Sequence, residues 1–574
     1  MAIVLAIHSG HDAAAAVFDD YRILAAVQKE RLSRIKKDHG EASACVDEVL
    51  SIAGIDRAAV DAVALTRDMF ARDHFRQGLV RRLREFAKPP RYVYPTLNRE
   101  MRRARTYEPR DVLDLAAVLR FYGLRADLPV SFVNHHFAHA LPALFFTDWD
   151  DALIYTADRA GDNATYSHRI FKDGRLDCLY GDDRMLHTAH PLNSLGRAYE
   201  AVTMALGFRS MHHEGKVTGL AAWGQPVLRD HFLSRFRVGD DGVVATDFPD
   251  EDSFRAHFVE PCKGVSREDC AASIQAFAET IALQSIERLL ARSRVRHIGL
   301  AGGFFANVRV NQRIAETAGI DELFVVPPMG DEGLVIGAGL HHLLERDGLA
   351  RWLDRRYRLD DVYWGRHYQD AGRRFLAFDP RIRALPGDPA ANAAELMAEG
   401  KVVALFAARM EFGPRALGAR TILASPARRD INDSLNKRLD RSEFMPFAPV
   451  VAEEDASAIF DLSGVNRYAC RFMTITCDVK REWRERIPAV VHVDGTARPQ
   501  LIRRRDNPLY FDILKEFERR SGLPVAINTS FNVHEEPIIN TPEEAARALV
   551  DDRVDYLVTE DGVYGLAAPR ERTG

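Results

Sequence analysis

Cysteine is scarce in this chain, with six residues among 574 and no CxxC pair. Paired spacing of that kind is typical of disulfide frameworks and of thiolate metal sites, so the sequence indicates neither. Scattered cysteines suit a reducing compartment, and we expect a cytoplasmic protein. The six are Cys45, Cys178, Cys262, Cys270, Cys470 and Cys477.

Long apolar runs are also lacking. No stretch approaches the roughly 20 apolar residues that a membrane-spanning helix needs. The first seven residues, MAIVLAI, are too short for a signal peptide and lack its basic leader. We therefore expect a protein without a membrane partner.

A strong charge of one sign is absent too. The net charge of −5 argues against a general nucleic-acid-binding protein. Residues 81–110 are locally rich in arginine, but glutamates interrupt them, and we interpret this segment as a solvated helical insertion. Recognition of an acidic substrate or partner is the alternative.

The composition is that of a globular protein, with 47% hydrophobic and 28% charged residues. Single hydrophobic cores rarely grow beyond about 250 to 300 residues, so a chain of 574 should form at least two domains. The charged and aromatic segment 349–368 has no clean period, and we interpret it as the connection between them.

The most informative stretch is 131–163. His135 and His139 stand four apart in a segment that we expect to be helical, so both imidazoles lie on one face. A buried strand is predicted at 151–157, and Asp158 follows it beside a turn rich in Gly and Asp. Asp331, on a Pro/Gly loop, is a candidate fourth ligand.

Such nitrogen and oxygen ligands suit Fe(II), Zn or Mn and leave positions open for a substrate oxygen. The alternative is that two histidines at this spacing are ordinary surface or core polarity. The zinc-protease signature has a glutamate directly after its first histidine, where this chain has His136, which argues against a metalloprotease.

A strand, polar turn, strand arrangement occurs at 3–18 and again at 152–170. This repeat looks like the actin, sugar-kinase and Hsp70 architecture, in which two such turns face a nucleotide. His11 lies in the first turn, where an imidazole can take a proton from a substrate hydroxyl. The alternative role is a turn residue bonded to its own backbone.

Further motifs are typical of phosphate or nucleotide contacts. Paired glycines that include Gly303 follow a predicted strand and permit close approach of a ligand to the backbone. In the second half, Arg415 lies in a Gly/Pro turn and offers a fork of donors for a phosphate or carboxylate. Each arginine alone is more often a surface ion-pair partner.

Taken together, the motifs resemble one family over nearly the whole chain: the O-carbamoyltransferases of nodulation factors and antibiotics, the NodU/CmcH type. The matching segments occur in the family's order, and they are SGHDAAAAVF, ERLSRIKK, NHHFAHA, the Asp158 turn, EGKVTGLAAWG, AGGFFANVRVN, VPPMGDEG, EFGPRALGART, FMPFAP, TARPQ and INTSFNVHEEPI.

The resemblance implies an α/β fold with an N-terminal actin-like (ASKHA) domain, similar to the tRNA threonylcarbamoyl-transfer protein, and a C-terminal YrdC-like α/β domain. We place these domains at 1–350 and 371–574, with a linker at 351–370. The implied activity is ATP-dependent O-carbamoyl transfer. Carbamoyl phosphate and ATP, with Mg, give carbamoyladenylate, whose carbamoyl group passes to a hydroxyl of a sugar or natural-product acceptor.

The resemblance also implies site residues. Fe(II), with Zn or Mn as alternatives, would be bound by His135, His139, Asp158 and Asp331. His11 falls on the family's proposed base, and Lys36, Gly303 and Asn307 fall on its adenylate contacts. The implied carbamoyl phosphate and ATP contacts of the second domain are Arg415, Arg441, Arg498, Asn528 and Ser530.

Three departures from the family pattern bear on these roles. Asp440 stands where antibiotic-type relatives carry a lysine, and Met445 where they carry an arginine. Arg441 is a candidate substitute for one of these lost contacts, and a different way of holding the phosphate is the alternative. Arg159 follows Asp158 where glycine is usual. Two other functions therefore stay open, a kinase-like phosphotransferase and a catalytically silent nucleotide-binding scaffold, and a homodimer is an open alternative for the assembly.

Overall fold

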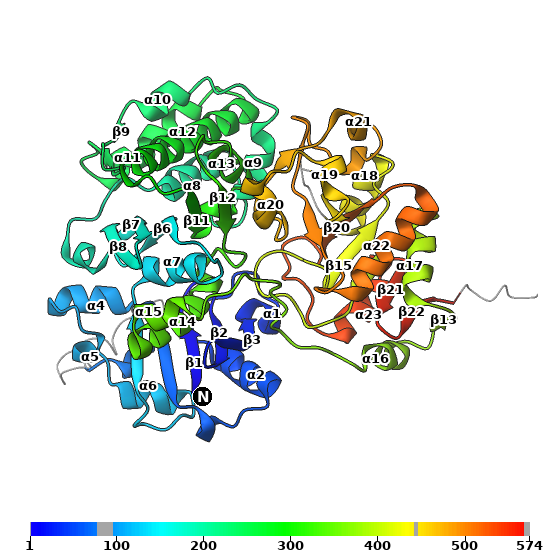
Figure 1. Cartoon of the computed structure of the whole chain (residues 1–574), viewed down its shortest axis with the longest axis horizontal. Coiled ribbons are helices and arrows are strands. Elements are labelled where there is room, and N and C mark those ends of the chain that lie inside the picture. The colour runs from blue at the N-terminus through cyan, green and yellow to red at the C-terminus, as the bar shows by residue number, and fades with distance from the viewer. Residues whose placement is uncertain (1, 77–95, 441–445, 568–574) are drawn as a thin grey trace, which may run out of the picture. The chain divides into compact units, whose positions relative to one another are not determined.

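The computed structural model describes residues 2–76, 96–440 and 446–567 (Figure 1). The chain divides into two compact units. The N-terminal unit comprises residues 1–33 and 37–359, and the C-terminal unit comprises residues 34–36 and 360–574. Among the described residues, no helix combines the length and the apolar character needed to span a membrane.

The first sheet of the N-terminal unit has the order β3-β2-β1-β4-β5. β2 is antiparallel to β1 and β3, whereas β4 and β5 continue the sheet parallel to β1. Its strands are β1 (Ile3–His8), β2 (Ala14–Asp19), β3 (Arg22–Gln28), β4 (Ala62–Thr66) and β5 (Val130–Val133).

A second sheet repeats this pattern, with the order β12-β11-β6-β7-β8. β6, β7 and β8 form an antiparallel meander, and β11 and β12 follow parallel to β6. This duplicated topology is that of the actin and sugar-kinase architecture, so the predicted α/β actin-like N-terminal fold is confirmed. The strands are β6 (Asp151–Gly161), β7 (Ala164–Lys172), β8 (Arg175–Tyr180), β11 (His297–Ala301) and β12 (Glu322–Val325).

Two helices of the N-terminal unit, α7 (His135–Phe145) and α14 (Leu334–Asp347), pack directly on each other. Gly337 permits this approach, because a Cβ there would lie 1.8 Å from the carbonyl oxygen of Ala138.

The N-terminal unit contains further helices and a small ribbon. The helices are α1 (Lys29–Ser33), α2 (Ser43–Ala53), α4 (Leu97–Ala104), α5 (Pro109–Val112), α6 (Leu115–Phe121), α8 (Leu195–Ala205), α9 (Glu214–Ala221), α10 (Arg229–Leu233), α11 (Glu251–Val259), α12 (Arg267–Ser293), α13 (Val308–Ala315) and α15 (Leu349–Leu353). The ribbon consists of β9 (Phe236–Val238) and β10 (Val244–Thr246).

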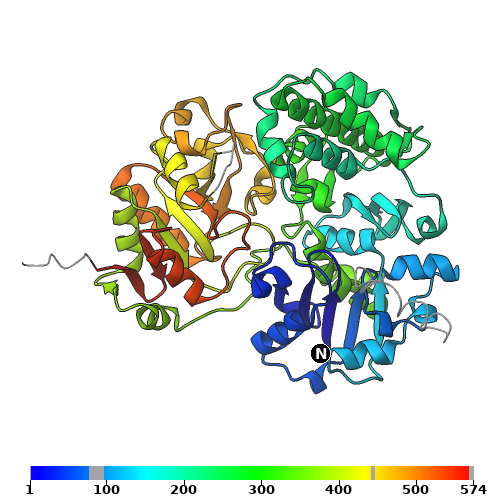
Figure 2. The ribbon, with the colours of Figure 1, turned by 180° about the vertical axis from the view of Figure 1, so that it is seen from behind.

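The C-terminal unit is built on a mixed sheet with the order β13-β22-β21-β14-β15-β20-β16-β19. Figure 2 shows the ribbon of this unit from behind. Its strands are β13 (Ile382–Leu385), β14 (Val403–Phe406), β15 (Arg420–Ala424), β16 (Ala448–Ala452), β19 (Gln500–Ile502), β20 (Val525–Ser530), β21 (Tyr556–Thr559) and β22 (Gly562–Leu566), with β17 (Cys477–Asp478) and β18 (Thr496–Ala497) paired separately. Its helices are α16 (Ala371–Phe378), α17 (Pro389–Ala398), α18 (Asp430–Arg438), α19 (Ala456–Ile459), α20 (Gly464–Cys470), α21 (Arg481–Arg484), α22 (Pro508–Ser521) and α23 (Pro542–Val550).

The segment EGKVTGLAAWG is helical from its first residue as α9. One local expectation differs from the structure. Asp158 was expected beyond the end of its strand, but β6 continues to Gly161. The pairing of β6 with β7 shifts register between Ala157 and Gly161, so Asp158 lies in a strand whose ladder is locally interrupted.

Candidate metal centre

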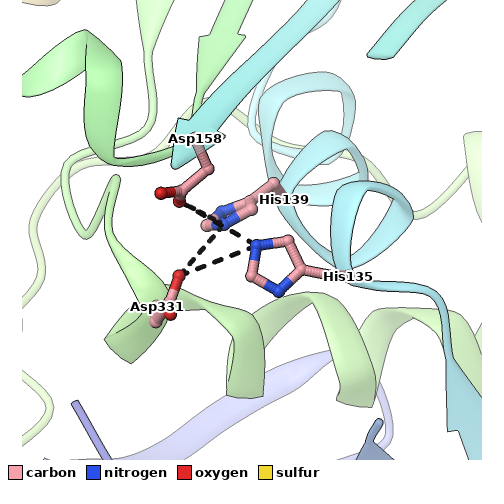
Figure 3. Close-up of side chains that lie close together, drawn as sticks. All are labelled: His135, His139, Asp158 and Asp331. Carbon is pink, nitrogen blue, oxygen red and sulfur yellow. Dashed lines mark ion pairs between the residues drawn. The ribbon is translucent and has the colours of Figure 1, made fainter. Parts of the chain in front are cut away.

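Four side chains from three separate parts of the N-terminal unit point toward one another (Figure 3). His135 and His139 come from α7, Asp158 from β6 and Asp331 from the turn before α14. One ligand atom from each lies within 4.8 Å of every other. The sequence prediction that these four residues meet therefore agrees with the geometry, and metal binding by them stays a prediction.

The distances fit a shared ion. The Nε2 atom of His139 lies 3.4 Å from Asp158 Oδ2 and 3.6 Å from Asp331 Oδ1, and the corresponding distances from His135 Nε2 are 3.9 and 3.7 Å. These separations exceed a hydrogen bond. Atoms that each lie about 2.0–2.2 Å from one ion are roughly 3–4 Å apart. Both Nε2 atoms are also buried without a hydrogen-bond partner, which is the arrangement that a metal ion satisfies.

The N-terminus of α7 is fixed by side chains. Asn134 caps the helix, because its Oδ1 accepts a hydrogen bond from the Phe137 amide at 3.1 Å. The amide of His135 donates to Asp162 Oδ2 at 2.7 Å. Asp183 accepts from the Asn134 amide group at 2.9 Å and forms a two-pronged ion pair with Arg67. The first imidazole is thus held in place through its own backbone.

Asp158 is oriented by backbone donors. Its Oδ2 accepts from the Gly303 amide at 3.0 Å, and its Oδ1 accepts from the Arg159 amide at 2.5 Å. Gly302, with a φ of 99°, brings the chain so close to β6 that a Cβ would lie 2.1 Å from the Ala157 carbonyl oxygen. Only glycine fits this conformation and this contact.

Gly161 supports His135 from the other side. A Cβ at this position would lie 2.1 Å from the imidazole ring of His135. No signal in the sequence distinguishes this glycine from an ordinary turn residue.

The electrostatics favour a positive charge between the two carboxylates. Burial opposes the charged form of His135, but Asp331 and Asp158 outweigh it and raise the pKa of His135 to about 9. Burial likewise opposes ionisation of Asp158, yet the neighbouring imidazoles of His135 and His139 hold its pKa well below its usual range. The site therefore attracts a cation, either protons on the imidazoles or a metal ion.

His11, the predicted base, lies within the electrostatic reach of this cluster. Burial lowers the pKa of His11, and the charge of Asp331 acts against that effect. Its Nε2 lies 3.3 Å from Asp12 Oδ2. The lowered pKa keeps the imidazole neutral at neutral pH, which is the form that accepts a proton.

Contacts with His8 and with the segment of Asp68 hold the backbone around His11 in place. Its carbonyl oxygen lies 2.7 Å from Nε2 of the fully buried His8, whose Nδ1 lies 2.7 Å from Thr66 Oγ1. A carbonyl oxygen only accepts, so Nε2 of His8 carries the proton and Thr66 donates to Nδ1. On the other side, Asp68 lies against Gly10, where an added Cβ would meet its carboxylate oxygen at 1.9 Å. Sequence reasoning missed His8, since a histidine at a strand end resembles any core residue.

The three predicted adenylate contacts lie in different surroundings. Gly303 lies beside Asp158, whereas Asn307 caps α13 and its amide group donates to Gln275 at 2.8 Å. Lys36 is exposed and belongs to the segment that clusters with the C-terminal unit. Its neighbour Lys37 is the lysine whose charge acts on His11. Contact of any of these residues with a nucleotide stays a prediction.

In the C-terminal unit, motifs far apart in sequence meet at one edge of the sheet. The loop that carries Arg415 leads into β15, whose first residues pair with the end of β20, so that Thr421 lies opposite Ser530. β19 begins just after Arg498 and runs parallel to β16. Arg415, Arg498, Asn528 and Ser530 are therefore neighbours, and their binding roles stay predictions. Arg441 and Met445 lie outside the described residues.

Two of the groups at this edge are buried supports of the Arg415 loop. Asn528 donates to the Ala416 carbonyl oxygen at 3.0 Å and to Gln500 at 2.6 Å. Glu411, fully buried, accepts from the amides of Leu417, Ala419 and Arg420. Glu411 is a further residue that sequence reasoning missed. Asp440, which replaces the lysine of relatives, pairs with Arg553 at 2.7 Å.

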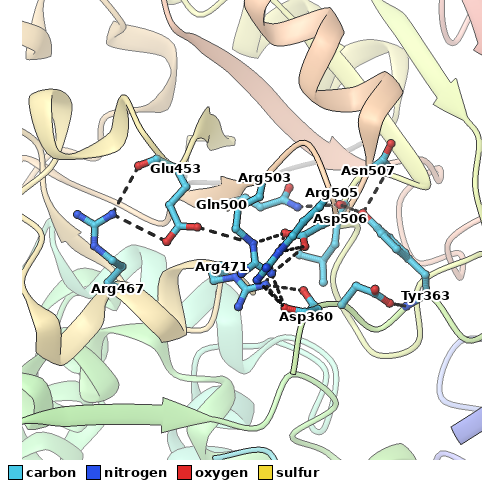
Figure 4. A network of polar contacts seen from close by, with 12 residues as sticks. Asp360, Tyr363, Glu453, Arg467, Arg471, Gln500, Arg503, Arg505, Asp506 and Asn507 are labelled. Carbon is cyan, nitrogen blue, oxygen red and sulfur yellow. Dashed lines mark hydrogen bonds and ion pairs between the residues drawn. The ribbon is translucent and has the colours of Figure 1, made fainter. Parts of the chain in front are cut away.

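An ion-pair network fixes the first residues of the C-terminal unit (Figure 4). Arg503 binds Asp506 with two hydrogen bonds and also donates to Asp360 at 2.7 Å. Arg471, which is 8% exposed, donates to the Asp360 backbone carbonyl oxygen at 2.7 Å. The segment that starts at Asp360 is therefore part of this unit's fold rather than a loose linker.

Comparison with known proteins decides the family. A family model described as the carbamoyltransferase N-terminus matches residues 4–340, and one described as the carbamoyltransferase C-terminus matches residues 394–565. The chain belongs to the carbamoyltransferase family. The resemblance inferred from the motifs is thereby confirmed, and the protein is a transferase.

Relatives of this carbamoyltransferase span nearly the whole chain. The nodulation protein NolNO of Sinorhizobium fredii is 31% identical over 96% of this chain and 78% of its own. The uncharacterized protein MJ1058 of Methanocaldococcus jannaschii is 29% identical over 92% of this chain and 94% of its own.

Some solved structures match part of this carbamoyltransferase chain. Full-length HypF in a phosphate- and nucleotide-bound form matches with a TM-score of 0.36 and 14% identity, over 60% of this chain and 47% of that one. A ROK-family glucokinase from Streptomyces griseus matches with a TM-score of 0.29 and 15% identity, over 59% of this chain and 98% of that one.

Proposed function

We propose that the protein is an ATP-dependent O-carbamoyltransferase that works in two steps. In the first, the C-terminal unit, a YrdC-like domain, uses carbamoyl phosphate, water and ATP. Hydrolysis of carbamoyl phosphate releases phosphate, and an oxygen of the resulting carbamate bonds to the α-phosphorus of ATP, so that carbamoyladenylate forms and pyrophosphate leaves. In the second, the N-terminal unit transfers the carbamoyl group to a hydroxyl of a sugar or natural-product acceptor, and AMP leaves.

The first step is supported by the donors gathered at one edge of the C-terminal sheet. Guanidinium forks such as those of Arg415 and Arg498 match the oxygens of a phosphate dianion. The buried carboxylate of Glu411 holds three loop amides, which fixes the backbone from which Arg415 projects. A rigid loop loses little entropy on binding an anion.

The second step is supported by the four-residue cluster, and this convergence is the observation that carries the proposal. His135, His139, Asp158 and Asp331 would hold Fe(II), with Zn or Mn as alternatives. When bound, the ion supplies a Lewis acid that neutralises phosphate charge or polarises a carbonyl oxygen.

His11 acts as the base of the transfer. The acceptor oxygen forms a bond to the carbamoyl carbon, the bond between that carbon and the AMP phosphate oxygen breaks, and the hydroxyl proton passes to the imidazole. Asp12 lies at Nε2, and a proton on that nitrogen leaves Nδ1 to receive the new one. The amide nitrogen makes a carbamoyl carbonyl unreactive, so a good leaving group such as AMP is needed.

The products test the proposal directly. The purified protein is supplied with ATP, Mg, carbamoyl phosphate and candidate hydroxyl acceptors, and the nucleotide products are separated. AMP and pyrophosphate that depend on carbamoyl phosphate are expected. ADP without AMP would instead favour the kinase-like phosphotransferase, and tight ATP binding without any pyrophosphate release would favour the silent scaffold.

A further inference from the structure

Helix α4 carries an unusual set of arginines beside the transfer site. Arg99, Arg102 and Arg105 are all exposed. None of the three forms an ion pair with a carboxylate in the described part of the chain, whereas Arg103 pairs with the buried Glu100. Arg99 and Arg102 stand three residues apart along the helix, as do Arg102 and the C-cap residue Arg105. Like charges at such spacing destabilise a helix unless an anion binds.

The helix is attached to the segment that holds the base. The amide of Leu97 donates to the Asp68 carbonyl oxygen at 2.7 Å, and the Asn98 side chain donates to the Arg67 carbonyl oxygen at 3.0 Å. Asp68 lies against Gly10, where an added Cβ would meet its carboxylate oxygen at 1.9 Å, and the Met69 amide donates to the Ser9 carbonyl oxygen at 2.8 Å. The start of α4 is therefore fixed relative to His11.

The same helix borders the turn that supports the metal cluster. Arg102 Nη1 lies 3.5 Å from Oδ1 of Asn163, at the tip of the β6–β7 hairpin. Gly161, two residues earlier, lies against the His135 ring. Two residues of chain span at most about 7 Å. The Arg102 guanidinium is therefore separated from the metal cluster by roughly the length of a small sugar phosphate or less.

The positive charge around the Asn163 turn is not fully balanced. Arg159 forms an ion pair with Glu200, and Arg197 forms one with Glu251. Among the described residues, Arg102 has no carboxylate partner. Burial lowers the pKa of His190, which faces the same turn, and the positive charges of Arg197 and Arg102 lower it further.

We propose that the acceptor carries an anionic group, a phosphate, sulfate or carboxylate, that Arg99, Arg102 and Arg105 bind while its hydroxyl faces His11. Guanidinium groups bind such anions through charge-assisted hydrogen bonds. This inference rests on the proposed function and adds to it the chemical class of the acceptor.

Three sugars that differ in charge provide the test: glucose, glucose 6-phosphate and glucosamine, each supplied with carbamoyl phosphate and ATP. Product is counted by the mass gain of one carbamoyl group. We expect kcat/KM to be at least about tenfold higher for the phosphate ester than for glucose. The triple variant Arg99→Ala, Arg102→Ala, Arg105→Ala should lose this preference and keep its activity with glucose.

The control variant removes three other exposed arginines of the same unit, Arg120, Arg175 and Arg292, and should keep the preference. A wild-type preference for the neutral or the amino sugar overturns the inference, and so does a triple variant that still prefers the anion. If no sugar is turned over, binding is ranked by saturation-transfer NMR, and an equal ranking of the three sugars overturns it.

Failure of the proposed function is distinguishable. The wild type would then release no AMP or pyrophosphate from ATP and carbamoyl phosphate. An incorrect acceptor class, in contrast, leaves this first step intact.

Discussion

At the scale of single residues, His8 shows how a buried group can control a catalytic one without contacting substrate. β1 and β4 run parallel, with Ile7 opposite Leu65, so His8 and Thr66 lie side by side at the strand ends. The imidazole between Thr66 and the His11 carbonyl oxygen uses both nitrogens. We infer that His8 positions the base.

Replacing His8 tests this positioning role. In His8→Leu, the His11 carbonyl oxygen and the Thr66 hydroxyl lose their partner, which should cost about 1–3 kcal/mol of stability. We expect transfer to slow by about tenfold or more, because a base displaced by a fraction of an ångström takes the proton poorly. His8→Gln keeps an N–H donor and should recover part of the rate.

Steady-state kinetics with separate assays of the two steps provide the measurement. Pyrophosphate release should be unchanged in both variants, since it belongs to the other unit. Equal transfer rates for the leucine and glutamine variants would show that the hydrogen bond does not matter.

At the scale of elements, the β6–β7 hairpin carries Asp158, one of the four proposed metal ligands, and supports the helix that carries His135 and His139. The apolar segment 151–157 predicted the buried strand, and the spacing of His135 and His139 predicted the helix face. The interruption of the ladder after Ala157 was not predictable, because it depends on the approach of Gly302 and Gly303 from a segment some 140 residues away.

Gly161→Ala tests the hairpin's support of the cluster. The added methyl group would overlap the His135 ring, so the ring must rotate or the hairpin must shift. We expect metal affinity to fall about 10- to 100-fold, the usual effect of disturbing the support of a ligand. Metal content after dialysis, measured by mass spectrometry, gives the result.

Gly215→Ala, in helix α9 with open space around its Cβ position, is the matched control and should retain the metal. A Gly161→Ala protein with the metal content of the wild type would contradict the proposed support.

The Arg415 loop is the corresponding element of the C-terminal unit. Glu411→Ala leaves three amides of this loop without their acceptor, so we expect the KM for carbamoyl phosphate to rise about tenfold or more and the melting temperature to fall. Glu411→Gln keeps the oxygen and should be milder. Glu395→Ala, at an exposed position of α17, should change neither quantity. An unchanged KM in Glu411→Ala would show that this carboxylate does not support carbamoyl phosphate binding.

At the scale of the whole molecule, the sequence predicted the repeated strand arrangement and the four residues of the cluster, because strand and helix periodicity are local properties. The roles of His8, Gly161 and Glu411 were not predictable. Each depends on a neighbour that the tertiary fold supplies, and a single buried histidine, glycine or glutamate has no local pattern. For the same reason, the sequence could not show that three arginines of the α4 segment have no carboxylate partner among the described residues.

The two steps should be separable by substitutions in the two units. Arg415→Ala removes an anion ligand of the first step, so no carbamoyladenylate should form. His139→Ala removes a buried ligand of the cluster, which is 2% exposed and should not affect the other unit's chemistry.

The most direct test is therefore made with His139→Ala, supplied with ATP and carbamoyl phosphate, in which pyrophosphate release and carbamoylated acceptor are measured side by side. We expect pyrophosphate release at the wild-type rate and no carbamoylated product. Loss of both to the same extent, or transfer at the wild-type rate, would contradict a metal cluster dedicated to the second step.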